Sequence, residues 1–264
     1  MSQPRFLPVD LSGRRVLVTG GAAGIGRVIA EGFLSAGART RVCDISEDAV
    51  AAIRHDLPEI EAVHADVSDP RSVDAMFDAI GREMGGIDIL VNDAGIPGPT
   101  GPIESLDPEQ LRRTLSINVE ALFLCAGRAV PMMRRQGFGH VINMSSVAGR
   151  LSYSNRTPYS AAKWGVVGFT KSLALEAGRD GIRVNAIMPG HVNSKLFAGV
   201  IDRRAATLDL TPEELKARIL DLVALKTTVE REDIANMALF LCSPFGSSIS
   251  GQTLSVCGGV EMMV

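Results

Sequence analysis

The sequence has few aromatic residues: one tryptophan and only two tyrosines, Tyr153 and Tyr159, in 264 residues. It also has no surplus of basic residues, because 27 Lys and Arg stand against 30 Asp and Glu. The resulting net charge of −3 gives no basic footprint for nucleic acid. No run of about 18 apolar residues is visible, since Arg128 interrupts the best stretch, and residues 1–15 lack the apolar core of a signal peptide. We therefore expect a cytoplasmic protein that binds neither nucleic acid nor a membrane.

Cysteine and histidine are scarce as well, with four of each scattered along the chain. No two cysteines have the CxxC spacing, and no group of these residues has the spacing of metal ligands. The sequence therefore predicts no metal site. We interpret the cysteines as reduced thiols, which suits a cytosolic protein; they are Cys43, Cys125, Cys242 and Cys257.

Short apolar runs alternate with amphipathic stretches along the whole chain. Strands that are apolar throughout and alternate with helices predict a parallel sheet covered on both faces. The fold class is therefore α/β, with one doubly wound Rossmann-type domain over residues 1–264 and a seven-stranded parallel sheet. The predicted strands are residues 14–19, 39–44, 61–66, 87–92, 140–145, 182–188 and 253–256, with helices between them from about residues 24, 46, 70, 108, 158 and 233.

Residues 190–228 interrupt this alternation with a mostly helical insertion. Thr211 as N-cap, Pro212 as the first helical residue and Glu214 as the third make a well-formed helix start within it. The insertion follows the sixth strand, so it lies at the carboxyl edge, where such sheets bind ligands. We expect it to be a lid over the substrate.

A glycine-rich turn, TGGAAGIG at residues 19–26, connects the first strand to the first helix. Gly20, Gly24 and Gly26 permit a tight turn and close approach of the backbone to a ligand. The helix N-terminus that follows favours the pyrophosphate of a dinucleotide. Because the strand–turn–helix context is also present, we interpret the turn as a nucleotide site rather than as a simple loop.

Asp44 ends the second strand 24 residues after Gly20. A carboxylate there can accept hydrogen bonds from the adenosine ribose hydroxyls and would repel a 2′-phosphate, which favours NAD over NADP. Arg39 and Arg41 flank the strand and weaken this argument, and a strand-end cap is the alternative role for Asp44. Further along, Asp66 can accept a hydrogen bond from the adenine amino group, and the small turn NDAG, residues 92–95, lets the backbone lie against the nucleotide.

Tyr159 and Lys163 are four residues apart at the start of the sixth predicted helix, so both side chains lie on one face. A free phenol is a poor base at neutral pH, but a nearby ammonium and a helix N-terminus favour the phenolate. Such a tyrosine can take the proton of an alcohol while a hydride leaves for a nicotinamide. The pair alone also occurs by chance on solvated helix faces.

Two neighbouring features strengthen this interpretation. Ser145 and Ser146 follow the fifth strand at the ligand-binding edge, where a hydroxyl can donate to a developing alkoxide. Asn118 lies within an apolar helix and needs partners for its amide. It either holds a water that relays protons from Lys163 or closes a local hydrogen bond to the backbone.

Taken together, these motifs resemble the short-chain dehydrogenase/reductase family over essentially the whole chain, in its compact single-domain form. The resemblance implies a catalytic tetrad, with Ser146 rather than Ser145 because the family's serine precedes the tyrosine by thirteen residues: Asn118, Ser146, Tyr159 and Lys163. It also implies cofactor contacts from Gly20, Ala23, Gly24, Ile25, Gly26, Asp44, Ile45, Asp66, Val67, Asn92, Ala94, Gly95, Tyr159, Lys163, Pro189, Gly190, Val192 and Ser194. Members are commonly homotetramers, so we expect the same here.

The chain departs from the family pattern at three positions. Asp93 stands where the family has a second asparagine, and Cys257 where an aspartate is common. Ser194 replaces a threonine, and its hydroxyl can make the same hydrogen bond to the nicotinamide carboxamide. None of these changes removes a member of the tetrad.

The leading hypothesis is an NAD-dependent oxidoreductase that interconverts a secondary alcohol and a ketone, with Tyr159 as the general acid/base. The alternatives are an NADPH-dependent 3-oxoacyl reductase, a non-catalytic nucleotide-binding regulator, and a sugar-nucleotide epimerase or dehydratase. Asp44 disfavours the NADPH-dependent reductase, and the intact tetrad disfavours the regulator. The short C-terminal region disfavours the epimerase or dehydratase. The substrate pocket is predicted to be mostly apolar, and the residues that should form it are Val147, Leu151, Tyr153, His191, Leu196 and Phe197.

Overall fold

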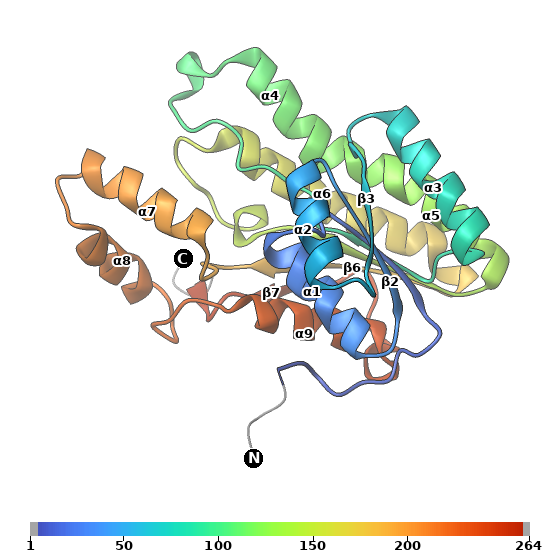
Figure 1. Ribbon diagram of the computed structural model, residues 1–264. Coiled ribbons are helices and arrows are strands. Elements are labelled where there is room, and N and C mark those ends of the chain that lie inside the picture. The colour runs from blue at the N-terminus through green and yellow to red at the C-terminus, as the bar shows by residue number, and fades with distance from the viewer. Residues whose placement is uncertain (1–4, 261–264) are drawn as a thin grey trace.

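The fold is built on a parallel sheet of seven strands, in the order β3-β2-β1-β4-β5-β6-β7 (Figure 1). The computed structural model describes residues 5–260, without the side chains of residues 195, 196, 203, 204, 206 and 207. All six strand pairings are parallel, so the predicted class and sheet are confirmed. The strands are β1 (Arg15–Thr19), β2 (Arg39–Asp44), β3 (Glu61–His64), β4 (Ile89–Asn92), β5 (Gly139–Met144), β6 (Ile182–Pro189) and β7 (Thr253–Val256).

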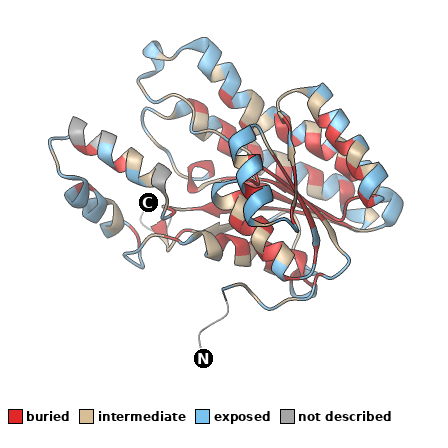
Figure 2. Cartoon of the chain, viewed as in Figure 1, coloured by how far each residue is buried: buried red, intermediate tan, exposed pale blue. Residues whose placement is uncertain are grey.

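Helices cover both faces of the sheet, and each face has its own apolar core. On one face pack α1 (Gly24–Ser35), α2 (Glu47–Asp56) and α9 (Arg231–Cys242). On the other pack α3 (Pro70–Met84), α5 (Ala121–Gln136) and α6 (Thr157–Ala177). The central strands β1, β4, β5 and β6 are almost wholly buried, the edge strands β3 and β7 are partly exposed, and the outer helix faces are exposed (Figure 2).

Two predicted helix starts are confirmed by side-chain caps. The Ser46 hydroxyl accepts a hydrogen bond from the Ala49 N–H at 3.2 Å, which fixes the first turn of α2. Thr211 and Glu214 form a reciprocal capping box at the start of α8 (Pro212–Asp221).

The long helical region from Pro108 to Gln136 is interrupted, which the sequence did not predict. Residues Ser116–Glu120 form a π-helical turn between α4 (Pro108–Leu115) and α5. By length and composition this run would also suffice to cross a membrane, with a mean hydropathy of 1.3 in its best window, which corrects the expectation that Arg128 excludes it. The core helix of a soluble protein meets the same criterion, and buried residues of α5 pack into the core beneath the sheet.

The segment of residues 190–228 stands out from the sheet at its carboxyl edge. It contains α7 (Lys195–Thr207) and α8, which project away from the sheet at the left of Figure 1. An isolated bridge between Val192 and Val229 ties the two ends of the segment together. The two helices share a small apolar cluster that comprises Phe197, Ile201, Ala205, Leu210, Leu215 and Ile219.

Candidate active site

A cavity of about 2680 Å³ runs along the carboxyl edge of the sheet. Its walls come from the turn after β1, the ends of β2 and β3, the loops after β4, β5 and β6, and the first turns of α6. The structure therefore brings most of the predicted site residues together: Gly20, Ala23, Gly24, Ile25, Asp44, Ile45, Asp66, Val67, Ala94, Gly95, Ser146, Val147, Leu151, Tyr153, Tyr159, Lys163, Pro189, Gly190, His191, Val192, Ser194 and Phe197. Gly26, Asn92 and Asn118 do not line it, and the Leu196 side chain lies outside the described residues.

The glycine turn fits the pyrophosphate of a dinucleotide. Gly20 and Gly24 have φ angles of +63° and +61°, which side chains disfavour. A Cβ on Gly20 would lie only 2.9 Å from the Ala94 Cα, so the turn and the loop after β4 are in close contact. At the N-terminus of α1, Ala23 provides no side-chain cap, which leaves backbone N–H groups available to an anion.

Gly26 and Asn92 support the site from within the protein. A Cβ on Gly26 would lie 2.5 Å from the Gly20 carbonyl oxygen, so only glycine fits beneath the turn. The Asn92 amide donates to Asn143 Oδ1 at 2.9 Å, and Asn143 donates in turn to the Thr170 hydroxyl at 3.0 Å. This buried chain joins β4 to β5 and α6, so the Asn92 side chain holds the strands in place and does not point into the cavity.

Asp44 closes the end of β2 and still faces the cavity. Its carboxylate accepts hydrogen bonds from the N–H groups of Ser46 and Ala22, at 3.1 and 3.4 Å. It is therefore a strand-end cap, as the alternative interpretation held, and it remains placed for a ribose. Beside it, Ile45 is 60% exposed on the cavity wall and offers an apolar surface for an adenine ring.

The two arginines of β2 are paired elsewhere. Arg39 Nε donates to Glu61 at 2.8 Å, and the buried Arg41 forms ion pairs with both Glu61 and Glu83. Both arginines are thus engaged in ion pairs with acidic side chains of the protein. Neither lines the cavity.

Asp66 also combines a local role with a place in the cavity wall. One oxygen of its carboxylate accepts from the Ser68 N–H at 2.8 Å and from the Ser68 hydroxyl at 2.6 Å. These bonds fix the turn after β3 and orient the carboxyl group at the edge of the cavity.

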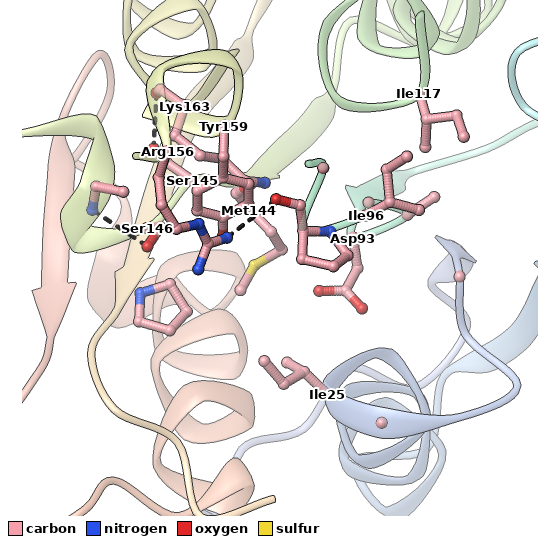
Figure 3. Close-up of a pocket in the computed structure, with 18 of the residues that line it drawn as sticks. Ile25, Asp93, Ile96, Ile117, Met144, Ser145, Ser146, Arg156, Tyr159 and Lys163 are labelled. Atoms are coloured by element: carbon pink, nitrogen blue, oxygen red, sulfur yellow. Dashed lines mark hydrogen bonds between the residues drawn. The ribbon is translucent and has the colours of Figure 1, made fainter. Parts of the chain in front are cut away.

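Tyr159 and Lys163 lie on one face of α6, as predicted. The helix starts at Thr157 with Arg156 as its N-cap, one residue before the expected start, and Tyr159 stays in the first turn. Lys163 is 6% exposed, donates to the Met144 carbonyl at 2.8 Å, and lies 5.6 Å from the Tyr159 ring centroid. Both side chains point toward the cavity from α6 (Figure 3).

The two serines after β5 have different surroundings. The buried Ser145 hydroxyl donates to the Lys163 carbonyl at 2.9 Å and is engaged inside the protein. The Ser146 hydroxyl lines the cavity and accepts from the Ala148 N–H at 3.2 Å, so its proton remains available to a ligand. Both serines line the cavity, but the Ser145 hydroxyl proton is already committed to the Lys163 carbonyl.

Asn118 sits at the centre of the π-helical turn and is 2% exposed. Its Oδ1 accepts from the Ile96 N–H at 2.8 Å, and its amide donates to the Ile96 carbonyl at 2.9 Å. These two bonds hold the loop after β4 rather than the helix itself. π-Helical turns often mark functional sites, and here the turn places Asn118 beside the cavity loop.

Asp93 follows β4 at the place where the family pattern has asparagine. Burial raises the pKa of its carboxyl group to about 7, while the charge of Lys163 and the Gly26 N–H offset part of that rise. The residue lines the cavity, with its carboxyl group turned toward the glycine turn (Figure 3). The sequence marked this position as unusual but did not indicate its ionisation.

Arg156 is a feature of the site that the sequence reasoning missed. Its guanidinium carbon lies 4.6 Å from the Tyr159 ring centroid, and Nη2 donates to the Pro97 carbonyl at 3.0 Å. It lines the cavity on the side where Ser146 and Tyr159 lie (Figure 3). The only signal in the sequence was its position three residues before Tyr159.

The wall opposite the glycine turn is mostly apolar. Val147 packs with Val223, Cys257 and Val260, and Leu151 and Tyr153 lie against this cluster. At the start of the segment of residues 190–228, the rings of His191 and Phe197 stack with their centroids 5.3 Å apart. These side chains form an apolar end to the cavity beyond Ser146 and Tyr159.

No group of three His, Cys, Asp or Glu side chains among the described residues could hold a metal ion. All four cysteines lie within the described residues, are buried, and form no disulfide.

Comparison with known proteins gives a consistent family. A family model described as enoyl-(acyl carrier protein) reductase matches residues 20–261. The uncharacterized oxidoreductase YxbG of Bacillus subtilis is 35% identical over 255 residues, which cover 95% of this chain and 92% of the relative. Levodione reductase of Leifsonia aquatica is 34% identical over 253 residues, covering 93% of each chain.

A solved structure agrees in fold and sequence. A variant of actinorhodin polyketide ketoreductase, crystallised with NADPH, superposes with a TM-score of 0.89 at 32% identity. The match covers 94% of this chain and 97% of that one.

Proposed function

The chain belongs to the short-chain dehydrogenase/reductase family, an enzyme family that uses NAD(P) and acts on hydroxyl and keto groups. On this premise we propose that it is an NAD-dependent enzyme that interconverts a secondary alcohol and a ketone. The observation that carries the proposal is the convergence of Ser146, Tyr159 and Lys163 on one cavity with an uncapped helix N-terminus and Asp44.

Tyr159 is the proposed general acid/base. In the oxidation direction it takes the proton of the alcohol, and the nicotinamide accepts the hydride. The Ser146 hydroxyl donates to the reacting oxygen and holds the substrate in place. The ammonium of Lys163, 5.6 Å from the Tyr159 ring centroid, favours the phenolate electrostatically.

Asn118 supports this arrangement through Ile96. Since both polar atoms of its amide bond the Ile96 backbone, its proposed task is to fix the loop after β4 beside Lys163. A Cβ on Gly95 would lie 2.9 Å from Asn118 Oδ1 and 3.7 Å from Lys163 Nζ, so the three groups meet at one point. A proton passed along from Lys163 would leave the site here.

The proposed cofactor is NAD rather than NADP. Asp44 would repel a 2′-phosphate, no Lys or Arg lies within the glycine turn, and Arg39 and Arg41 are paired with Glu61 and Glu83. The similarity to a ketoreductase that binds NADPH keeps an NADPH-dependent ketoreductase as the second candidate.

The remaining parts of the proposal concern assembly. We propose one domain over residues 1–264, with residues 190–228 as the substrate lid. Exposed aromatic side chains on α5 and α6, Phe123 at 57% and Trp164 at 53%, support a homotetramer that uses the helix carrying Tyr159. A cytoplasmic location remains an expectation, which the lack of a disulfide among the four buried cysteines supports.

The test is a screen of secondary alcohols and ketones with each cofactor, in which the absorbance of the reduced nicotinamide reports turnover. We expect kcat/KM at least about tenfold higher with NAD than with NADP, because an uncompensated 2′-phosphate beside Asp44 is repelled. In Tyr159→Phe we expect kcat to fall at least about 10²- to 10⁴-fold while NADH still binds.

The outcomes separate the parts of the proposal. A preference for NADP would overturn the cofactor assignment and leave the reaction class in place. Full activity in Tyr159→Phe would overturn the assignment of the acid/base.

A further inference from the structure

Arg156 is a half-buried cation inside the active-site cavity with no acidic partner among the residues that the structure describes. Two other shielded arginines of this chain are neutralised by acids: Arg15 pairs with Asp88, and Arg41 with Glu61 and Glu83. The half-buried Arg183 has no acidic partner among the described residues, but several carbonyl oxygens and His140 accept its hydrogen bonds, whereas Arg156 has a single acceptor. Charged side chains are seldom buried unless they are paired, because the lost hydration must be replaced. The Arg156 site therefore lacks a negative charge.

The guanidinium is held so that one edge stays open. Nη2 donates to the Pro97 carbonyl at 3.0 Å, and Nε is buried without a hydrogen-bond partner. Nη1 makes no hydrogen bond within residues 5–260 and is not among the buried, unpartnered atoms, so it remains accessible on a residue that lines the cavity. A guanidinium fixed in this way is preorganised to receive an anion.

The open edge of the Arg156 guanidinium lies close to the proposed acid/base, Tyr159. The guanidinium carbon lies 4.6 Å from the Tyr159 ring centroid, on the Ser146 side of the cavity. An anion bound there would belong to the molecule whose alcohol or ketone reacts at Tyr159. It would lie a few carbon atoms from the reacting carbon.

We propose that Arg156 binds a carboxylate of the substrate, and that the enzyme acts on a hydroxy acid and its keto acid. This inference rests on the proposed function and narrows its substrate class. A carboxylate suits one guanidinium, whereas a phosphate dianion generally needs further donors or cations. Lys163, a second cation beside Tyr159, already donates to the Met144 carbonyl.

A purely structural role for Arg156 makes a different prediction. If the guanidinium only stacks on Tyr159 and holds the Pro97 loop, its loss would impair charged and neutral substrates alike. A comparison of one substrate pair, alike in shape and different in charge, separates the two roles.

The experiment measures kcat and KM with NAD for 3-hydroxybutyrate and 4-hydroxypentanoate, each against its primary amide. We expect the wild-type enzyme to prefer each acid, and Arg156→Gln to lower the acid-to-amide ratio of kcat/KM about 10- to 100-fold, mainly through KM for the acid. The acid-to-amide ratio of Arg156→Lys should lie between those of the wild-type enzyme and Arg156→Gln, because lysine keeps the charge and lacks the planar guanidinium. Arg112→Gln, at an exposed arginine of α4 that lines the outer cavity, is the matched control and should keep the wild-type ratio.

Binding is measured in parallel, so that the inference does not depend on turnover. With NADH present, 3-hydroxybutyrate should raise the Tm of the wild-type protein more than its amide does, and Arg156→Gln should remove the difference. An absent preference for acids, or an equal loss for acids and amides in the variant, would overturn the inference while the proposed function stood. Absence of turnover with every alcohol would overturn the proposed function, and the Tm comparison would still decide the role of Arg156.

Discussion

Two aspartates at opposite ends of β4 have opposite electrostatic surroundings. Asp88 precedes the strand, where burial would raise the pKa of its carboxyl group, but the hydrogen bonds and charge of Arg15 outweigh burial and lower it. Asp93 follows the strand, where burial raises the pKa to about 7 and no arginine compensates among the groups that act on it. The same residue type, five positions apart, is thus stabilised as an anion at one end and destabilised at the other.

The two edges of the sheet differ in the same sense. At the amino edge, Asp88, Arg15 and Gln136 satisfy one another, and Arg183 bonds to His140 and to backbone carbonyls. At the carboxyl edge, burial destabilises the Asp93 anion, and Arg156 has no acidic partner among the described residues. Satisfied polar groups contribute to folding, whereas unsatisfied groups in a cavity are available to ligands. Substitutions at the amino edge should therefore mainly lower the free energy of unfolding, and substitutions at the carboxyl edge should mainly change catalysis.

The largest expected effect is at the carboxyl edge, with Ser146→Ala. We expect kcat to fall about 10²- to 10³-fold, because the donor to the reacting oxygen is lost. The free energy of unfolding should fall by only about 1 kcal/mol, since the hydroxyl caps one short turn. Steady-state kinetics and urea denaturation measure the two.

Ser145→Ala is the matched control for that change. Its hydroxyl bonds the Lys163 carbonyl in the interior, so we expect a loss of about 1–3 kcal/mol of stability and less than a tenfold loss of kcat. Equal losses of kcat in the two variants would contradict the assignment of Ser146.

At the amino edge, Asp88→Asn should destabilise the protein by about 2–4 kcal/mol, because it leaves the Arg15 guanidinium without its counter-charge. In the wild-type protein this contribution is present above the ordinary carboxyl pKa and is lost as the pH falls through the lowered pKa. Urea denaturation at several pH values measures it. A kcat reduced by more than a few-fold would show that the two edges are not independent.

The smallest expected effect has the opposite sign. Burial raises the pKa of Asp93 from the ordinary aspartate value of 3.8 to about 7, so the folded state holds the extra proton between these pH values. The wild-type free energy of unfolding should therefore decrease as the pH rises from about 4 to 7 and stay level above 7. Asp93→Asn should remove this decrease and be more stable at pH 8 by about 1–3 kcal/mol. The same pH slope in both proteins would show that Asp93 does not cause it.

Much of the fold was predictable because its signals are local. Apolar runs such as the RVLVT of β1 mark buried strands, and the glycine turn, the Ser46 cap and the Thr211–Glu214 box each lie within a few residues of chain. Tyr159 and Lys163 are one helical turn apart, so helix geometry alone places them on one face. The two serines could not be told apart from local sequence, because both follow the same strand. Only the structure shows that the Ser145 hydroxyl bonds the Lys163 carbonyl and the Ser146 hydroxyl does not.

The features that the sequence did not predict depend on residues far apart in the chain. Asn92 bonds a residue 51 positions away, Arg156 bonds one 59 positions away, and Asn118 bonds Ile96, 22 positions away. The π-helical turn at Ser116–Glu120 has no local composition signal. Helix propensities and caps do not report such pairings, since tertiary contacts decide them.

The apolar cluster shared by α7 and α8 has an evolutionary consequence. Because these helices bury their apolar side chains against one another, residues in them can change with little disturbance to the two cores of the sheet. The bridge between Val192 and Val229 marks the ends of the part that can vary. Related chains can thus keep the glycine turn and the tyrosine unchanged while the sequences of α7 and α8 diverge.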